Sequence, residues 1–355
     1  MIRFILSLLA FSTIAMQGCT KDTLNDNEGS NSNNTWLIPV DQVLDGGPGK
    51  DGIPSLQNPA FINVQEASYL EDDDLVLGFV EGDDVRAYPH PILDWHEIVN
   101  DDFDNHSVAV IYCPLTGTGI GWDRIINETQ TTFGVSGLLY NANVIPYDRA
   151  TDSNWSQLLM KSVNGPLKGT SAKGYNLLET NWATWKDLYP DSRVLSTQTG
   201  FNRNYGNYPY GSYKTSDKLI FPVNNTDDRL HLKERVLALI ENEIARAYRF
   251  SSFEPTISMV LDEFLSAKLV IVGSNNLNFM VAFQRELSDG TLLEFEVVMD
   301  QLPVILSDQE GNHWDIFGRA VNGPREGEQL QQLTQMMGYW FSFAAFYPGI
   351  SIYNF

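Results

Sequence analysis

Cys113 and His96 are the two side chains of this sequence whose types could do chemistry together. Cys113 ends an apolar run, and His96 lies in the segment Asp94-Trp95-His96-Glu97. A thiolate and an imidazole suit copper or zinc, and Glu97 or Asp94 could ligate the ion or orient the imidazole. The same groups could instead make Cys113 a nucleophile with His96 as its base. A third interpretation is that both side chains simply pack in the core.

Two short elements must position these residues. A helix is expected to begin after Pro91, because proline is favoured in the first turn. This helix would carry four residues on one face, namely Ile92, Trp95, His96 and Val99. The β-branched and apolar run at residues 108–113 predicts a buried strand that ends at the cysteine. The imidazole and the thiol therefore come from elements that lie close together in the chain.

A second segment resembles the first about 160 residues further on. Three landmarks recur at spacings of 160 or 158 residues: Arg86-Ala87-Tyr88 as Arg246-Ala247-Tyr248, Asn164-Gly165-Pro166 as Asn322-Gly323-Pro324, and Trp182 with Tyr189-Pro190 as Trp340 with Tyr347-Pro348. Solenoid repeats have periods of roughly 20 to 50 residues. The longer period indicates a duplicated unit of domain size.

The duplication predicts a β-rich α+β fold of two pseudo-symmetric units. Each unit is expected to be a mostly antiparallel sheet with one closing helix. These helices are expected at residues 181–188, with Thr180 as N-cap, and at residues 339–346. The predicted boundaries are a leading segment at 36–75, repeat unit 1 at 76–195, a connector at 196–235 and repeat unit 2 at 236–355.

The two units differ in their polar residues. Residues shared by both units are interpreted as scaffold. The first unit has His90 and His96 after its Ala-Tyr pair, whereas the second continues Arg249-Phe250-Ser251 and has no cysteine. A single working site is therefore predicted in repeat unit 1.

The N-terminus predicts export. Arg3, a short apolar run and Gly18-Cys19 have the order of a secretory signal peptide at residues 1–18. Cys19 after a glycine resembles the lipidated cysteine of bacterial lipoproteins, so membrane anchoring through lipid on the periplasmic or cell-surface side is expected. The alternative is plain secretion. Residues 19–35 are polar and predict a flexible tether.

The composition of the chain limits the classes of molecule that it can bind. Among 355 residues, 23 Lys and Arg oppose 45 Asp and Glu, which gives a net charge of −22. Such a surface repels phosphate backbones, so nucleic-acid binding is excluded. The connector carries four tyrosines among Gly, Asn and Pro: Tyr205, Tyr208, Tyr210 and Tyr213. Such a segment suits contact with a sugar or a protein, or covers the seam between the two units.

Several motifs together resemble the domain of unknown function 3179 family. They include the run that begins at Arg86 and ends at Asp101, the Tyr112-Cys113-Pro114-Leu115 strand end, the Asn164–Gly169 turn and the opening loop at residues 45–54. Members commonly continue with a second cysteine after Leu115. This chain has Thr116 there, which argues against a dithiol redox centre or a two-thiolate metal site.

Two functional hypotheses follow. The first is an exported lipoprotein with a copper or zinc site, or a redox-related role, built on Cys113 and His96. The second is a non-catalytic lipoprotein that binds a ligand or a partner through the aromatic connector and the cleft between the units.

Overall fold

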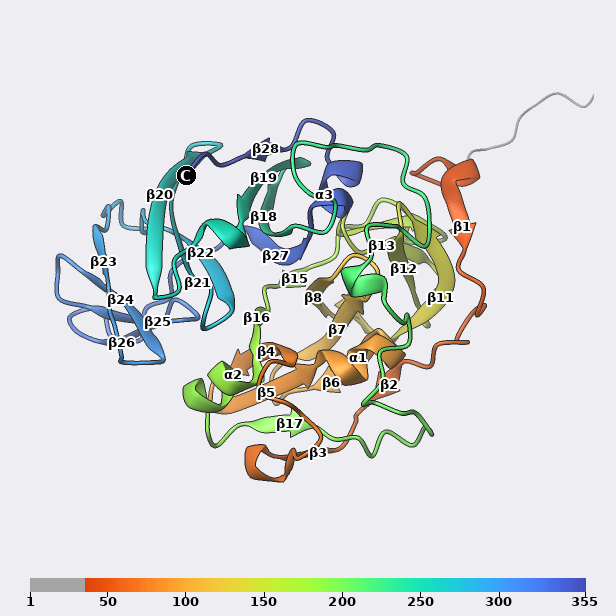
Figure 1. Ribbon diagram of the computed structural model, residues 1–355, viewed down its shortest axis with the longest axis horizontal. Coiled ribbons are helices and arrows are strands. Elements are labelled where there is room, and N and C mark those ends of the chain that lie inside the picture. Colours follow the sequence, from red (N-terminus) through yellow and green to blue (C-terminus); the bar gives the residue numbers. More distant parts are fainter. Residues whose placement is uncertain (1–35) are drawn as a thin grey trace, which may run out of the picture. The chain divides into compact units, whose positions relative to one another are not determined.

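Short strands dominate the fold, as the β-branched and aromatic runs indicate. The computed structural model describes residues 36–355, and Figure 1 shows their arrangement. The expected signal peptide, the lipidation site at Cys19 and the tether at 19–35 lie outside the described residues. Contacts join residues 35–355 into one compact unit, so the two halves are not separate domains.

The first half contains three sheets among the described residues, where the sequence predicted one sheet per unit. The first has the order β16 (Leu178–Asn181), β4 (Leu75–Glu81), β5 (Asp84–Pro89), β17 (Arg193–Leu195), β3 (Phe61–Asn63). The second has the order β15 (Gly174–Tyr175), β8 (Thr118–Asp123), β7 (Ser107–Cys113), β6 (Ile98–Asp102), β2 (Leu56–Gln57). The third has the order β1 (Val43–Asp45), β11 (Phe133–Tyr140), β12 (Asn143–Asp148), β13 (Asn154–Ser156), β14 (Lys161–Asn164). The strands divide into small packed sheets, because strongly twisted open sheets rarely grow large without splitting.

The described part of the second half also contains three sheets. The first has the order β27 (Thr334–Tyr339), β18 (Arg235–Glu241), β19 (Ile244–Arg249), β28 (Ser351–Ile352). The second has the order β20 (Ser258–Phe264), β21 (Ala267–Ser274), β22 (Phe279–Gln284). The third has the order β23 (Phe295–Val297), β24 (Val304–Asp308), β25 (His313–Asp315), β26 (Ala320–Asn322). A small hairpin of β9 (Ile125–Ile126) and β10 (Thr129–Gln130) belongs to the first half.

The order of strands is the same in corresponding sheets. β16-β4-β5-β17 matches β27-β18-β19-β28. The pairs β5-β17 and β19-β28 are parallel in both cases. The packing between the halves is reciprocal. β8 of the first half lies against β27 of the second, and the corresponding β22 lies against β16. Two of the core clusters also combine residues of both halves.

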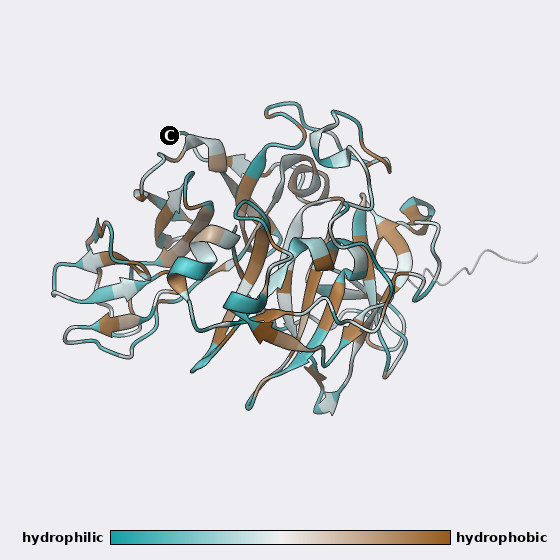
Figure 2. Cartoon of the chain, turned by 60° about the horizontal axis from the view of Figure 1, so that its bottom comes forward, coloured by the Kyte–Doolittle hydropathy of each residue, from teal (hydrophilic) through white to brown (hydrophobic). Residues whose placement is uncertain are grey.

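The leading segment completes only the first half. Its strands β1, β2 and β3 pair with β11, β6 and β17, which would otherwise be the edge strands of the three first-half sheets. In the described part of the chain, no additional strand covers the corresponding edges of the second half at β23, β20 and β28. Hydrophilic residues are concentrated in the loops and apolar residues in the strands (Figure 2).

The helices are short, and their boundaries differ slightly from the predictions. α1 (His90–His96) already ends at His96, so Val99 belongs to strand β6 rather than to the face of this helix. α2 (Trp182–Leu188) has Asn181 as N-cap instead of Thr180, because the Asn181 side chain accepts from the Thr184 amide at 2.9 Å. α3 (Trp340–Phe346) begins one residue later than expected. The 3-10 turns are η1 (Val40–Gln42), η2 (Val64–Glu66), η3 (Tyr213–Thr215) and η4 (Phe250–Ser252).

Membrane-spanning helices are not found among residues 36–355, where no helix is both long and apolar enough to cross a bilayer.

Candidate functional site

Cys113 is a buried thiol at the end of β7. Its Sγ lies 3.7 Å from the carbonyl oxygen of Ala142. Burial raises the pKa of the thiol to about 11, and the nearby Glu97 carboxylate acts in the same direction. A thiol with such a pKa stays protonated at neutral pH, whereas nucleophilic attack requires the thiolate.

His96 is engaged by other groups. Its Nδ1 lies 2.7 Å from the carbonyl oxygen of Pro54, and its Nε2 lies 2.7 Å from the hydroxyl of Tyr205. Burial lowers the pKa of the imidazole. Both ring nitrogens are thus used in fixing the leading segment and the connector to α1. Among residues 36–355, no group of three or more His, Cys, Asp or Glu side chains could hold a metal ion.

Thr116 belongs to a buried hydrogen-bonded network beside Cys113. Its hydroxyl lies 2.8 Å from the Thr118 hydroxyl and accepts from Asn143 Nδ2 at 3.0 Å. Gln157 completes the network by accepting from Thr118 Oγ1 at 2.7 Å. The position of the family's second cysteine is therefore occupied by a satisfied hydroxyl in the core.

Asp94 and Glu97 both face the connector. The Asp94 Oδ2 atom lies 3.1 Å from the Nζ of Lys214, and Glu97 Oε1 accepts from the Tyr210 hydroxyl at 3.2 Å. Both carboxyls are buried, which raises the pKa of Asp94 to about 6 and that of Glu97 to about 7. Glu97 ends α1 with φ of 56°, a conformation that residues other than glycine rarely adopt.

A cluster of buried polar groups extends from Asp94 along α1 to the second half. His90 Nε2 lies 3.4 Å from Glu179 Oε2, and Glu179 Oε1 accepts from Arg235 Nη2 at 2.6 Å. Burial lowers the pKa of His90 well below its usual range, with further lowering by the charges of Lys214 and Arg235, so this imidazole is neutral. We call these five residues, His90, Asp94, Glu179, Lys214 and Arg235, the seam cluster.

Two atoms of the seam cluster are buried without a hydrogen-bond partner among the described residues. They are His90 Nε2 and Asp94 Oδ1, which lie one helical turn apart on α1. The contact from His90 to Glu179 is close enough for an ion pair but does not have hydrogen-bond geometry. Leaving such a polar atom unsatisfied costs about 1–3 kcal/mol. These two atoms therefore mark a place where another molecule could supply the missing hydrogen bonds.

Two members of the seam cluster, His90 and Glu179, have apolar counterparts in the second half. Glu179 pairs with Leu77 across the first sheet, and Met337 pairs with Leu237 at the equivalent place in the second half. Glu179 therefore corresponds to Met337. His90 follows β5 as Phe250 follows β19. Comparison of the two halves thus singles out His90, which the sequence marked as a difference between the halves but not as a predicted site residue. The same comparison could have marked Glu179 and Arg235 as charges at positions that are apolar in the other half, but not that they meet α1. Lys214 lies in the connector, which has no counterpart.

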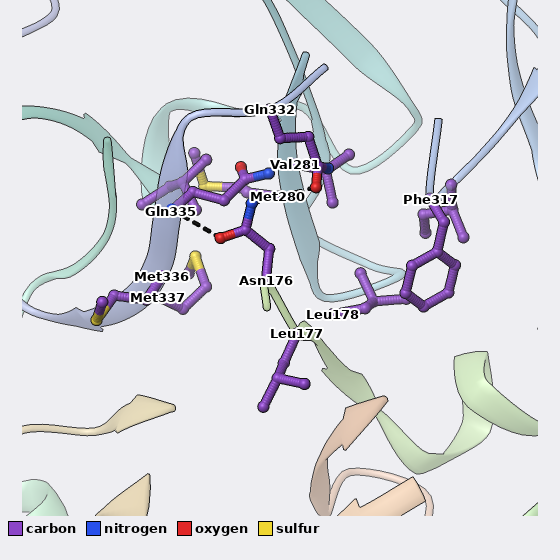
Figure 3. A pocket seen from close by; sticks show the side chains of 12 residues that line it. Asn176, Leu177, Leu178, Met280, Val281, Phe317, Gln332, Gln335, Met336 and Met337 are labelled. Atoms are coloured by element: carbon purple, nitrogen blue, oxygen red, sulfur yellow. Dashed lines mark hydrogen bonds between the residues drawn. The ribbon is translucent and has the colours of Figure 1, made fainter. Parts of the chain in front are cut away.

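A small pocket between the two halves serves packing. It lies where the segment before β16 meets β22 and β27, and Figure 3 shows its lining. Asn176 Nδ2 donates to Gln332 Oε1 at 3.1 Å, and the backbone N–H of Gln335 donates to Asn176 Oδ1 at 3.0 Å. The remaining cavity is about 20 Å³, which is room for about one water molecule. We therefore interpret this pocket as part of the contact between the halves.

Replacing Glu97 with glutamine is expected to stabilise the protein at pH 8 but not at pH 4. Burial raises the folded-state pKa of Glu97 from 4.5 to about 7, so the folded protein takes up a proton that the unfolded chain has released. Stability linked to this group is present below pH 4.5 and is lost as the pH rises through about 7. The full difference is of the order of 3 kcal/mol.

Urea unfolding of the wild type and of Glu97→Gln across this pH range measures the effect. Glu286→Gln, which alters an exposed carboxylate paired with Lys268, is the control. Parallel pH profiles for the wild type and Glu97→Gln would contradict the prediction.

The fold and the site together define a β-rich protein with a buried polar cluster at the contact between its two halves. Residues 50–350 match the family model described as protein of unknown function (DUF3179), and the chain belongs to this family. No curated protein and no solved structure matches the chain.

Proposed function

We propose that this chain is an exported lipoprotein that binds a small polar ligand at the seam cluster and catalyses no reaction. The observation that carries the proposal is the pair of buried, unpartnered atoms on α1, His90 Nε2 and Asp94 Oδ1. Charged groups surround this pair from both halves and from the connector. Ligand sites commonly lie between such units and hold a few convergent polar groups.

We also infer that the two halves arose by duplication. The matching strand orders support this inference, as does the reciprocal packing of β8 on β27 and β22 on β16. Equivalent side-chain contacts recur as well. Trp155 Nε1 donates to Asp148 at 3.0 Å, and Trp314 Nε1 donates to Asp308 at 2.8 Å. A site present in one half only is then a specialisation of a common scaffold.

A copper, zinc or redox centre on Cys113 and His96 receives less support. Both His96 nitrogens face other groups, which argues against a metal site, and the raised pKa of Cys113 disfavours reaction of the thiol as a nucleophile. Export and lipid anchoring at Cys19 rest on the N-terminal sequence alone, as does attachment to a membrane.

The proposal is tested by thermal unfolding with a panel of small molecules. The panel comprises monosaccharides, dicarboxylates, neutral amino acids and alkylammonium ions. One class is expected to raise the melting temperature of the wild type, because a ligand that binds only the folded state stabilises it. Isothermal titration then gives the affinity.

Substitutions in the seam cluster test whether the ligand binds there. His90→Phe and Glu179→Met introduce the residues found at the corresponding positions of the second half, and both are expected to abolish binding. Met337→Leu is the matched control and should bind as the wild type does. Absence of binding by every class would contradict the proposal. Stoichiometric copper or zinc that disappears in Cys113→Ser would instead support a metal centre.

A further inference from the structure

Lys214 places an ammonium group where the seam cluster can recognise one. Its Nζ lies 3.1 Å from Asp94 Oδ2 and 4.2 Å from the centre of the Tyr208 ring. A carboxylate together with the face of an aromatic ring is a favourable environment for an ammonium ion. The Lys214 side chain is 40% exposed, whereas that of Asp94 is only 4% exposed. The ammonium therefore enters from the solvent side and meets a buried carboxylate.

The groups that remain available in the seam cluster favour a hydrogen-bond donor. Arg235 already donates to Glu179 Oε1 at 2.6 Å and to Asn278 Oδ1 at 2.7 Å. Asp94 Oδ1 is left as an acceptor without a partner. An anion would meet Asp94 and Glu179 as like charges, whereas an ammonium ion would meet them as opposite charges.

We propose that the ligand of the seam cluster carries a primary ammonium group, and that the Lys214 side chain occupies the place of this group in the present structure. This proposal rests on the function proposed above and names its ligand class. Lysine has a flexible four-carbon stem, so its ammonium can swing into solvent without unpacking the core. The remainder of the connector stays fixed meanwhile, because Tyr213 donates to the Leu115 carbonyl at 2.8 Å.

Removal of the Lys214 side chain tests the proposal directly. Lys214→Ala and Lys214→Met are expected to unfold at a lower temperature than the wild type, and n-butylammonium chloride is expected to restore the loss. The affinity for n-butylammonium should be about tenfold higher in both variants than in the wild type, in which Lys214 competes for the site. Butan-1-ol, which has the same carbon chain but no charge, should have no effect.

Lys186→Ala is the matched control. Lys186 is 36% exposed, pairs with Asp72 at 2.6 Å and lies 5.8 Å from the centre of the Trp182 ring, so it too has a carboxylate and an aromatic ring beside it, but its carboxylate is 77% exposed. Addition of n-butylammonium should not stabilise this variant. Equal stabilisation of Lys186→Ala and Lys214→Ala would overturn the proposal, because it would show a non-specific salt effect.

Asp94→Asn in the Lys214→Ala background separates recognition from folding. Circular dichroism checks that this double variant is folded, and its loss of n-butylammonium binding supports the proposal. Tyr208→Leu in the same background keeps the carboxylate and should weaken binding by removing the ring. If a neutral ligand class binds in a Glu179-dependent manner while n-butylammonium does not bind Lys214→Ala, the ammonium proposal fails and the proposed function stands. If no class binds, both fail.

Discussion

Replacement of Arg235 by leucine is expected to lower the free energy of unfolding by about 3–5 kcal/mol. The guanidinium lies 2.6 Å from Glu179, whose side chain is only 4% exposed. The substitution leaves that carboxylate buried and without its counter-charge. Burial already raises the pKa of Glu179, and loss of Arg235 should raise it further. The destabilisation should therefore be larger at pH 8 than at pH 5, where protonation relieves the buried charge.

A double variant provides the control for this prediction. Arg235 corresponds to Leu75, because Arg235 pairs with Tyr339 as Leu75 pairs with Asn181. Glu179 corresponds to Met337. Arg235→Leu combined with Glu179→Met therefore installs the apolar residue types found at the two corresponding positions. Replacing a buried ion pair by apolar residues of similar volume is often neutral. Urea unfolding should show that the double variant recovers most of the loss. A double variant as unstable as Arg235→Leu would show that the charge itself is not the cause.

Gly78→Ala is expected to cost about 3 kcal/mol, at the upper end for overpacking of a core. A Cβ atom at this position would overlap the ring of Trp185, which is fully buried under strand β4. The ring cannot easily move away, because its Nε1 donates to Ser192 Oγ at 2.9 Å. Denaturant unfolding measures the loss, and Gly206→Ala, in an open part of the connector, should leave stability unchanged.

The second half indicates how the clash can be relieved. The residue that corresponds to Gly78 is Ala238, and the residue that corresponds to Trp185 is Phe343. A larger strand residue is thus combined with a smaller aromatic ring. Gly78→Ala/Trp185→Phe should be more stable than Gly78→Ala alone. If the second substitution adds to the loss, then the two positions do not compensate each other as they do in the second half.

Local sequence patterns predicted the elements but not how they assemble. The run at residues 108–113 lies within β7, the predicted second and third helices lie within one residue of α2 and α3, and the first was expected to run three residues beyond the end of α1. These features depend on neighbours in the chain, such as apolar periodicity, capping and proline. The division into three sheets per half was missed because pairings such as β17 with β5 join residues more than a hundred positions apart. Local patterns carry no information about such pairings.

The site was predicted only in part for the same reason. Cys113 and His96 attracted attention by residue type, yet both lie in well-satisfied surroundings. The seam cluster needs α1, β16, the connector and β18 to meet at one point, and its members are as far apart in the chain as His90 and Arg235. Placement of the polar site in the first half followed from comparing the two halves. The three partners of α1 in this site required the structure.

The reciprocal packing of β8 on β27 and of β16 on β22 has a consequence for the ancestor that a duplication implies. When a surface patch of one copy meets the equivalent patch of another in both directions, the contact is isologous. A gene that encoded one half would have produced a two-fold symmetric homodimer with two identical seams. Fusion of the two copies would then have freed each seam to evolve by itself, so that charges could accumulate at one of them only.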